Sequence, residues 1–225
     1  MYQLLLLEKE LNSYQKIEKA ISMKKYMKNK FEFYGISSPK RKEIQQKYFQ
    51  VWKQKTNALN KFELIFLLWD LEYREYQYIA IDWMKKWKKT LWIEEDIDCL
   101  SHLISHKSWW DSVDLLASNC LSNYFLQYPN KVEYICDNWS NSNNLWLERS
   151  TLIFQLKFKE KTNFDLLSKY IFILKDKKDF FIQKAIGWSL REYAKTNRDI
   201  VFEFINKNNI VGLAKREALK NQILF

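Results

Sequence analysis

The sequence has few of the residues that bend or break a helix. It holds 3 Gly and 2 Pro among 225 residues. Few positions can therefore adopt a positive φ at low cost, and little interrupts helix formation. No stretch alternates between apolar and polar residues for long enough to indicate a sheet. The scarcity of these residues predicts an all-α protein with short polar connections.

Cysteine and histidine are also scarce. Cys99, Cys120 and Cys136 are widely spaced and odd in number, which argues against a disulfide framework. His102 and His106 are four residues apart, but no Glu stands between them as in a metalloprotease motif, and no Cys lies at ligand spacing. We interpret both as helix-surface histidines. We expect no structural metal, no cofactor and a reducing compartment, the bacterial cytoplasm.

Long apolar runs are absent as well. The run of four Leu at 4–7 is too short for the apolar region of a signal peptide, and neither a basic segment nor a small-residue cleavage site flanks it. No run approaches the length of about 20 residues that a membrane span needs. We therefore expect a soluble protein without a membrane partner.

Basic and aromatic residues, by contrast, are abundant. The chain carries 37 Lys and Arg against 27 Asp and Glu, a net charge of +10, and aromatic residues make up 17%, including 10 Trp. Excess positive charge favours a polyanionic partner, and aromatic rings beside basic residues can pack against nucleic-acid sugars and bases. Most of these rings must nonetheless belong to the core.

Apolar residues recur with helical periodicity along the whole chain. The predicted helices are 2–12, 16–29, 39–52, 60–69, 73–88, 93–105, 109–125, 129–138, 143–158, 163–174, 179–195, 198–206 and 213–222. Ser38 before Pro39 is a predicted N-cap, and so is Asp179. No linker or low-complexity tail interrupts the pattern, so we expect a single domain spanning 1–225.

An internal repeat is visible in these helices. Tyr73, Trp110, Trp146 and Phe181 each stand near the start of a strong amphipathic helix, at successive separations of 37, 36 and 35 residues. A shorter helix precedes each of the later ones. A two-helix unit recurring at this period is typical of an α-solenoid. We therefore predict a curved α-solenoid of HEAT-like repeats, with the second helix of each pair lining the concave side.

Two of these helices carry unusual polar faces. In "KSWWDSVDL", at 107–115, Trp110 and Asp114 are four residues apart and share one helical face. On a later helix, three cations surround Trp188 on one face: Lys184, Arg191 and Lys195. The purely structural interpretation is a core Trp beside a solvated helix start, together with a solvated basic face. The functional interpretation is an electrostatic site for a positively charged group.

These residues also carry a family resemblance. The chain resembles the AlkD-like DNA alkylation repair family, DNA glycosylases built from HEAT-like repeats. The likeness spans nearly the whole chain in conserved order and spacing. The similar segments are "YMKNKFEFYGISSPKRKEI" at 26–44, "LWDLEYREYQ" at 68–77, "HKSWWDSVD" at 106–114, "LWLERSTLIFQLKFK" at 145–159 and "FFIQKAIGWSLREYAKTN" at 180–197.

The resemblance implies a role for several residues. Asp114 matches the catalytic carboxylate, whereas Trp110 and Trp188 match aromatic residues that flank the damaged nucleotide. Arg149 matches a cation that grips the DNA backbone, and Tyr26 matches an aromatic residue from the N-terminal helices. Lys184, Arg191 and Lys195 would hold flanking phosphates without reading sequence.

The implied activity is hydrolysis of the N-glycosidic bond of 3-methyladenine or 7-methylguanine in duplex DNA, by a monomeric and monofunctional enzyme. The resemblance also implies contact through backbone and sugar, without a deep base-reading pocket. Two alternatives stay open at this point. A non-catalytic HEAT-like module would bind DNA, with Asp114 at a helix start and Trp110 in the core. A protein scaffold would instead use the basic face to meet an acidic partner.

Overall fold

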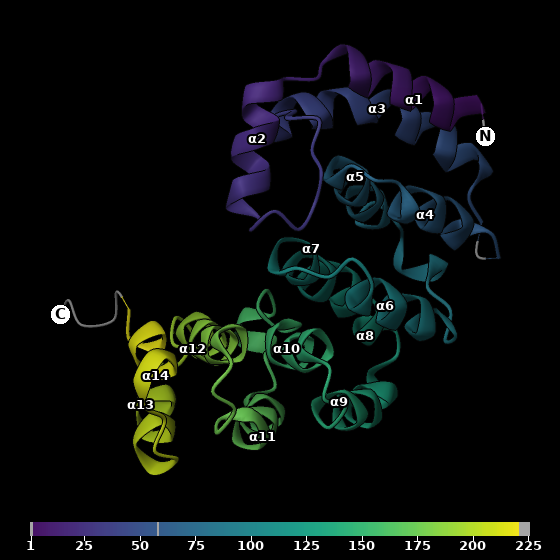
Figure 1. Cartoon of the computed structure of the whole chain (residues 1–225). Coiled ribbons are helices and arrows are strands. Elements are labelled where there is room, and N and C mark those ends of the chain that lie inside the picture. Colours follow the sequence, from purple (N-terminus) through teal and green to yellow (C-terminus); the bar gives the residue numbers. More distant parts are fainter. Residues whose placement is uncertain (1, 58, 221–225) are drawn as a thin grey trace. The chain divides into compact units, whose positions relative to one another are not determined.

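The computed structural model describes residues 2–57 and 59–220. Within these ranges it consists of helices and connections, without a strand and with one isolated bridge between Glu32 and Tyr73 (Figure 1). The predicted all-α fold is therefore confirmed. The chain divides into two compact units, residues 1–93 and residues 94–225, and no linker in the sequence marks this division. Each unit is described by itself.

The N-terminal unit is built from five α-helices and one short 3₁₀ turn among its described residues. They are α1 (Tyr2–Ser13), α2 (Ile17–Tyr26), α3 (Ser38–Lys55), α4 (Lys61–Asp70), α5 (Arg74–Met84) and η1 (Lys89–Leu91). Helix α1 packs on α3, α3 on α5, and α4 on α5. The apolar faces meet in a core that includes the fully buried Leu7, Leu11, Ile65 and Trp69.

A buried carboxylate fixes the long connection between α2 and α3. Glu75, on α5, accepts hydrogen bonds from the backbone N–H groups of Tyr34, Gly35 and Ile36, at 3.1, 3.0 and 3.2 Å. Gly35 has a φ of +80°, and a Cβ there would lie 2.2 Å from the backbone oxygen of Lys16. Only Gly fits this approach. Burial raises the pKa of Glu75 even though the three N–H groups favour its ionised form.

The C-terminal unit consists of paired helices. Its elements are α6 (Asp96–Ser105), α7 (Trp110–Leu115), the π-helical segment η2 (Leu116–Leu121), α8 (Ser122–Gln127), the 3₁₀ turn η3 (Pro129–Lys131), α9 (Val132–Ser140), α10 (Leu145–Ile153), the 3₁₀ turn η4 (Lys159–Lys161), α11 (Phe164–Leu174), α12 (Phe180–Tyr193), α13 (Arg198–Lys207) and α14 (Gly212–Ala218). Helices α7, η2 and α8 follow one another without a break.

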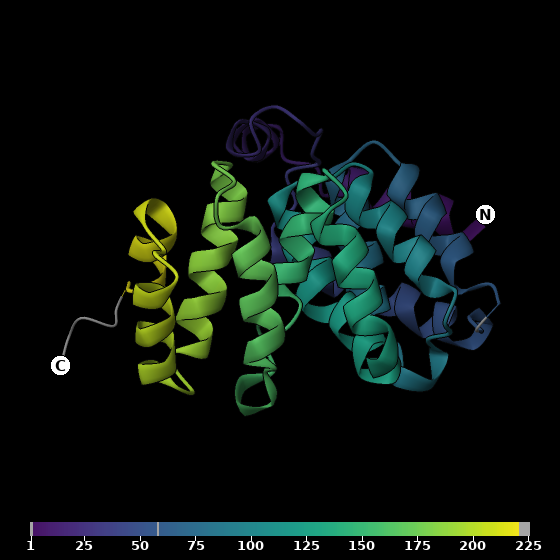
Figure 2. The same ribbon diagram turned by 90° about the horizontal axis from the view of Figure 1, so that it is seen from below.

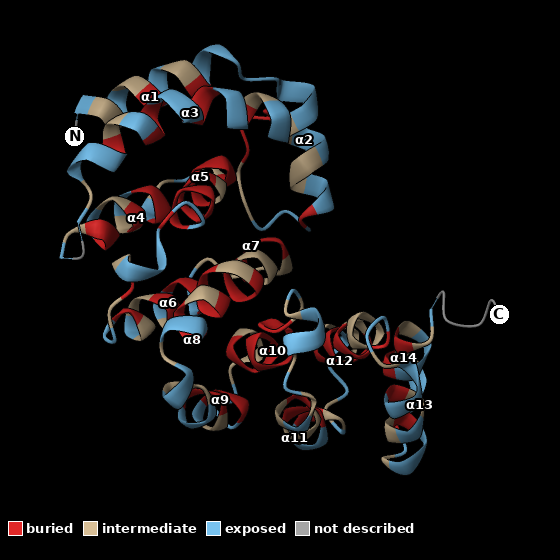
Figure 3. Ribbon diagram, turned by 180° about the vertical axis from the view of Figure 1, so that it is seen from behind, coloured by how far each residue is buried: buried red, intermediate tan, exposed pale blue. Residues whose placement is uncertain are grey.

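The second helices of successive pairs lie side by side in this unit. Helix α7 contacts α10, α10 contacts α12, and α12 contacts α14. Helices α9 and α11 form a second layer against α10 and α12 (Figures 1 and 2). Buried residues gather where α10 and α12 meet their neighbours (Figure 3). The recurring two-helix unit predicted from the sequence thus places α7, α10, α12 and α14 in one row.

The predicted helix boundaries agree with the observed ones within a few residues over most of the chain. The largest difference is in α10, which ends at Ile153 and continues as turns, whereas a helix to 158 was expected. Ser38 is not an N-cap, because α3 begins there and Ser37 is its cap residue. Asp179 does cap α12, accepting hydrogen bonds from two backbone N–H groups. The helix predicted at 213–222 is too long, because α14 ends at Ala218; positions 221 and 222 lie outside the described residues.

Candidate active site

The first turns of α7 present a tryptophan and a carboxylate on one face. Trp110 begins the helix, and Asp114 follows four residues later. Both are half-buried, whereas the neighbouring Asp111 is buried. Directly after Asp114 the helix widens into the π-helical segment, where Ser118 and Asn119 donate hydrogen bonds to the backbone oxygens of Asp114 and Leu115. Side-chain bonds of this kind compete with the regular α-helical pattern.

Asp114 is held by a two-point ion pair. Arg149, on α10, donates from Nε to Oδ1 at 2.7 Å and from Nη2 to Oδ2 at 2.9 Å. Its Nη1 donates to the backbone oxygen of Phe181. The exposed fractions of the two side chains are 16% for Asp114 and 5% for Arg149. A paired fork of this geometry fixes both the position and the orientation of the carboxylate.

The environment of Asp114 shifts its protonation equilibrium. Burial raises the pKa of this carboxyl, the contacts with Arg149 lower it, and the charge of Asp111 raises it. The net direction is upward, because loss of hydration outweighs the attraction of the guanidinium. Arg149 is thus the group that favours the ionised form of a carboxyl in a poorly hydrated position.

An open depression of about 330 Å³ lies over this ion pair. Asp114 and Arg149 line it together with the two predicted tryptophans, Trp110 from α7 and Trp188 from α12. The structure therefore brings together four residues that the sequence singled out on three separate helices. The remaining lining residues are Phe180, Phe181, Lys184, Arg191 and Glu217.

Aromatic residues that the sequence did not assign to the site support its floor and rim. Trp109, Trp146 and Phe181 form a cluster with ring centroids 5.1 to 5.7 Å apart. Phe180 packs edge-on against Phe181 and is 55% exposed. Trp146 and Phe181 stood out only as markers of the repeat. Their recurring position at the start of each second helix was the signal that could have placed them here.

The cations of α12 are not free in this structure. Lys184 and Arg191 both pair with Glu217 of α14, at 2.8 and 3.0 Å, and Arg191 also donates to the backbone oxygen of Glu217. The hydrogen bond from Lys184 is the largest influence that holds the pKa of Glu217 below its usual range. The sequence prediction did not include Glu217, because it lies 26 residues beyond Arg191 on another helix.

A close helix contact places Glu217. Gly187, on α12, faces α14, and a Cβ at this position would lie 2.4 Å from the Cβ of Glu217 and 2.7 Å from the backbone oxygen of Ala214. The missing side chain lets α14 approach α12 closely enough for Glu217 to reach both cations.

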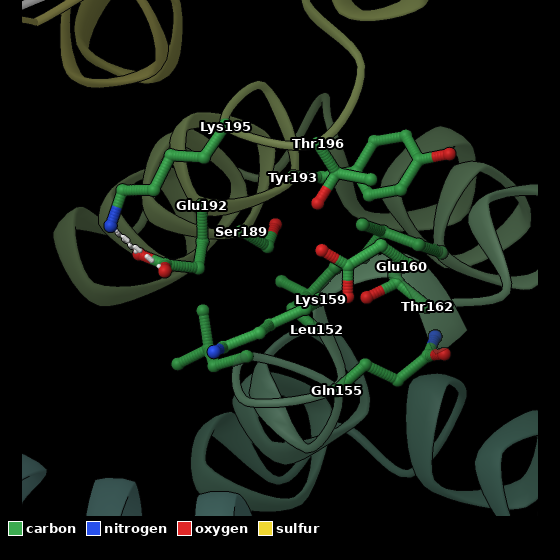
Figure 4. Close-up of a pocket in the computed structure, with 12 residues that line it drawn as sticks. Leu152, Gln155, Lys159, Glu160, Thr162, Ser189, Glu192, Tyr193, Lys195 and Thr196 are labelled. Carbon is green, nitrogen blue, oxygen red and sulfur yellow. Dashed lines mark hydrogen bonds and ion pairs between the residues drawn. The ribbon is translucent and has the colours of Figure 1, made fainter.

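Lys195, the last residue of the predicted cationic row, belongs to a different cavity. It pairs with Glu192 at 2.7 Å beside a hollow of about 140 Å³ between the end of α12 and the segment after α10 (Figure 4). It does not line the depression over Asp114. Tyr26 lies in the N-terminal unit, at the end of α2, and is 66% exposed.

The described residues offer no group of three or more His, Cys, Asp or Glu side chains that could hold a metal ion. His102 and His106 are exposed, and their rings stack 5.1 Å apart. No disulfide joins the three cysteines. None of the helices over 2–57 and 59–220 is both long and apolar enough to cross a membrane.

The fold and the site together define a protein of paired helices with a carboxylate and two tryptophans in one open depression. The family described as "DNA alkylation repair enzyme" matches residues 7–221, and the chain belongs to this family. It is also similar to a solved structure described as a predicted DNA alkylation repair enzyme from Enterococcus faecalis. That similarity has 33% sequence identity and a TM-score of 0.86, and covers 94% of this chain and 98% of the other. No curated protein matched the chain.

Proposed function

We propose that this chain is a DNA glycosylase that hydrolyses the N-glycosidic bond of cationic alkylated purines in duplex DNA. The observation that carries the proposal is the depression over Asp114, in which this carboxylate lies beside two tryptophans. Carboxylates and the faces of aromatic rings both attract positive charge. A substrate that is cationic, or becomes so in the transition state, fits this combination.

The chemistry of alkylated purines matches such a site. A purine methylated at N3 or N7 carries a positive charge and leaves as a neutral base when the bond to C1′ breaks, so no general acid is required. The sugar then becomes oxocarbenium-like, and a water oxygen forms the new bond to C1′. The carboxylate of Asp114 can stabilise the developing charge and can accept a proton from that water. Trp110 and Trp188 would cover the sugar and exclude other water molecules.

Arg149 acts through Asp114 in this proposal. The sequence led us to expect a direct contact between Arg149 and the DNA backbone. Because its Nε, Nη1 and Nη2 all donate within the protein and its side chain is 5% exposed, we assign it the positioning of the carboxylate instead. The guanidinium also favours the ionised form of Asp114, against the larger effect of burial, which raises the pKa of this carboxyl.

A covalent lysine mechanism is not favoured. Lys184 is paired with Glu217, and Lys195 is paired with Glu192. A lysine must be free to reach C1′ to form a Schiff base, whereas both of these lysines are held in ion pairs. We therefore propose a monofunctional enzyme that leaves an intact abasic site. The open form of the depression supports contact through sugar and backbone, as expected for lesions whose bonds are already weak.

The test is release of 7-methylguanine from alkylated duplex DNA with enzyme in excess, comparing the unmodified protein with Asp114→Asn. We expect the rate of Asp114→Asn to fall about a hundredfold, the typical cost of removing one electrostatic stabiliser. Asp137→Asn is the matched control, since it removes the same charge from a half-buried ion pair with Lys169 that lies outside the depression. Release at equal rates by all three proteins would contradict the catalytic role. Absence of release by the unmodified protein would favour a non-catalytic DNA-binding module.

A further inference from the structure

The positive charge of the chain is concentrated in its N-terminal unit. Residues 1–93 hold 19 Lys and Arg against 10 Asp and Glu, a net charge of +9, whereas residues 94–225 hold 18 against 17. The candidate active site thus lies in a nearly neutral unit, and Glu217 pairs with two of its cations. The excess charge that attracts a polyanion must therefore act mainly from residues 1–93.

This unit contains a cleft of about 480 Å³, a volume within the range of sites that hold small ligands. Its two walls are the C-terminal half of α3 and the end of α5 with the residues that follow. The lining residues of α3 include Gln46, Phe49, Gln50 and Lys53, which share one helical face. The opposite wall contributes Trp83, Lys86, Trp87 and Lys88. No Asp or Glu lines the cleft.

Three lysines surround this cleft without an ion-pair partner among the described residues. Lys53, Lys86 and Lys88 are all exposed. Lysines near helix C-termini also interact favourably with the negative end of the helix dipole, and each such contact stabilises the helix by about 0.3–1 kcal/mol. That structural role explains Lys53 and Lys86. It does not explain Lys88, which lies four residues after Met84, the last residue of α5, or the hollow between the three side chains.

The floor of the cleft is aromatic. The rings of Phe49 and Trp83 lie 5.1 Å apart, and Trp87 packs edge-on against Phe62 at 5.2 Å. The indole Nε1 atoms of Trp83 and Trp87 are buried, and neither has a hydrogen-bond partner among the described residues. A buried donor without an acceptor costs about 1–3 kcal/mol. Both residues line the cleft, and their Nε1 atoms lie beneath its surface.

We propose that this lysine-ringed cleft binds single-stranded DNA, with one nucleotide in the hollow and the adjoining phosphates on Lys53, Lys86 and Lys88. Lysines that follow the backbone, combined with aromatic side chains under the bases, are the general means of binding a single strand. Lys55 and Lys89, both exposed, extend the positive surface along α3 and η1. A strand of DNA would contact this extended positive surface, whereas a free nucleotide would not. The cleft is a hollow that would take one unstacked nucleotide, and it is not a flat surface of the kind that a duplex would cover.

The experiment measures binding of a fluorescein-labelled decathymidylate by fluorescence anisotropy over a series of salt concentrations. The test protein carries Lys53→Gln, Lys86→Gln and Lys88→Gln. If each lysine meets one phosphate, log K against log salt should become less steep by roughly 2, because each contact to a single strand contributes about 0.7. We expect affinity to fall at least tenfold at low salt. The DNA is undamaged, so the result is independent of base excision.

The matched control carries Lys9→Gln, Lys19→Gln and Lys42→Gln, which remove the same charge from exposed positions of the same unit outside this cleft. The control should bind nearly as well as the unmodified protein. Equal losses in both triple variants would overturn the proposal, since they would show a general effect of net charge. The proposal would also be overturned if the test variant lost equal affinity for decathymidylate and for undamaged duplex. A third contrary result would be that thymidine monophosphate displaces the labelled strand as well as unlabelled oligonucleotide does. Far-ultraviolet circular dichroism establishes that each variant is folded.

Discussion

Replacing Asp114 by Asn should disturb the stability of the protein as well as its chemistry. In the folded chain the carboxylate accepts two hydrogen bonds from Arg149, whose side chain is 5% exposed. An amide of the same shape offers one acceptor oxygen, and its NH₂ group faces an N–H donor of the guanidinium. Arg149 is then left buried beside a neutral partner. Breaking a buried pair in this way costs about 3–5 kcal/mol.

We take the lower end of this range, about 3 kcal/mol, because one hydrogen bond to the amide and the bond to Phe181 persist. For a chain of this size each kcal/mol lowers Tm by roughly 2–4 °C, so Tm should fall by about 6–12 °C. Urea unfolding measures the change in free energy and thermal unfolding measures Tm, both followed by circular dichroism. Asp137→Asn, at a more exposed ion pair, is the control. Rates of base release must therefore be compared at a temperature where Asp114→Asn is still folded.

A second substitution separates the ion pair from the catalytic role. Adding Arg149→Met to Asp114→Asn removes the stranded charge and leaves an apolar side chain of similar length. The double variant should be more stable than Asp114→Asn by about 2 kcal/mol, yet equally inactive. If Asp114→Asn unfolds within about 0.5 kcal/mol of the unmodified protein, the pair is not buried as described. The assignment of Arg149 as a positioning residue then fails.

Three further predictions concern the same depression. Burial raises the pKa of Asp114, and in the proposed mechanism only its ionised form is active. The single-turnover rate should therefore decline on acidification at a pH where exposed carboxylates are still ionised, and a flat profile down to acid unfolding would contradict this. Glu217→Gln should release Lys184 and Arg191, so that binding of undamaged duplex tightens and its salt slope steepens by up to about 2, measured by anisotropy. Gly187→Ala should lower the free energy of unfolding by about 1–3 kcal/mol, because α14 must shift.

The repeat could be predicted from the sequence because it depends on local spacing. Tyr73, Trp110, Trp146 and Phe181 stand at or next to the first residues of α5, α7, α10 and α12. Helical periodicity and scarce Gly and Pro were sufficient for the fold class. Placing Asp114, Arg149 and Trp188 in one depression required, in addition, that the second helices of successive pairs be neighbours. The spacing of about one repeat between these residues predicted that arrangement.

The partners of the charged residues could not be predicted in the same way. Whether a cation is exposed to a ligand or neutralised depends on which helix packs beside it. Glu217 comes from α14, which lies beyond Phe181, the last marker of the sequence repeat. The contact depends on Gly187, whose role becomes visible only when the two helix backbones are placed together. Likewise Arg149 was expected to face DNA, but its guanidinium is turned inward toward Asp114 and Phe181.

The pairing of Lys184 and Arg191 with Glu217 has a consequence for selectivity. A depression that contained unpaired lysine and arginine beside Asp114 would repel a cationic purine and would weaken the contrast between charged and neutral bases. Glu217 reduces that repulsion by offsetting one of the two positive charges, and it leaves Lys184 and Arg191 in place beside the tryptophans. General attraction to DNA then has to come from elsewhere, and residues 1–93 carry nearly all of the net charge. In the proposed function, this division of charge lets the site favour a cationic purine while the chain as a whole attracts DNA.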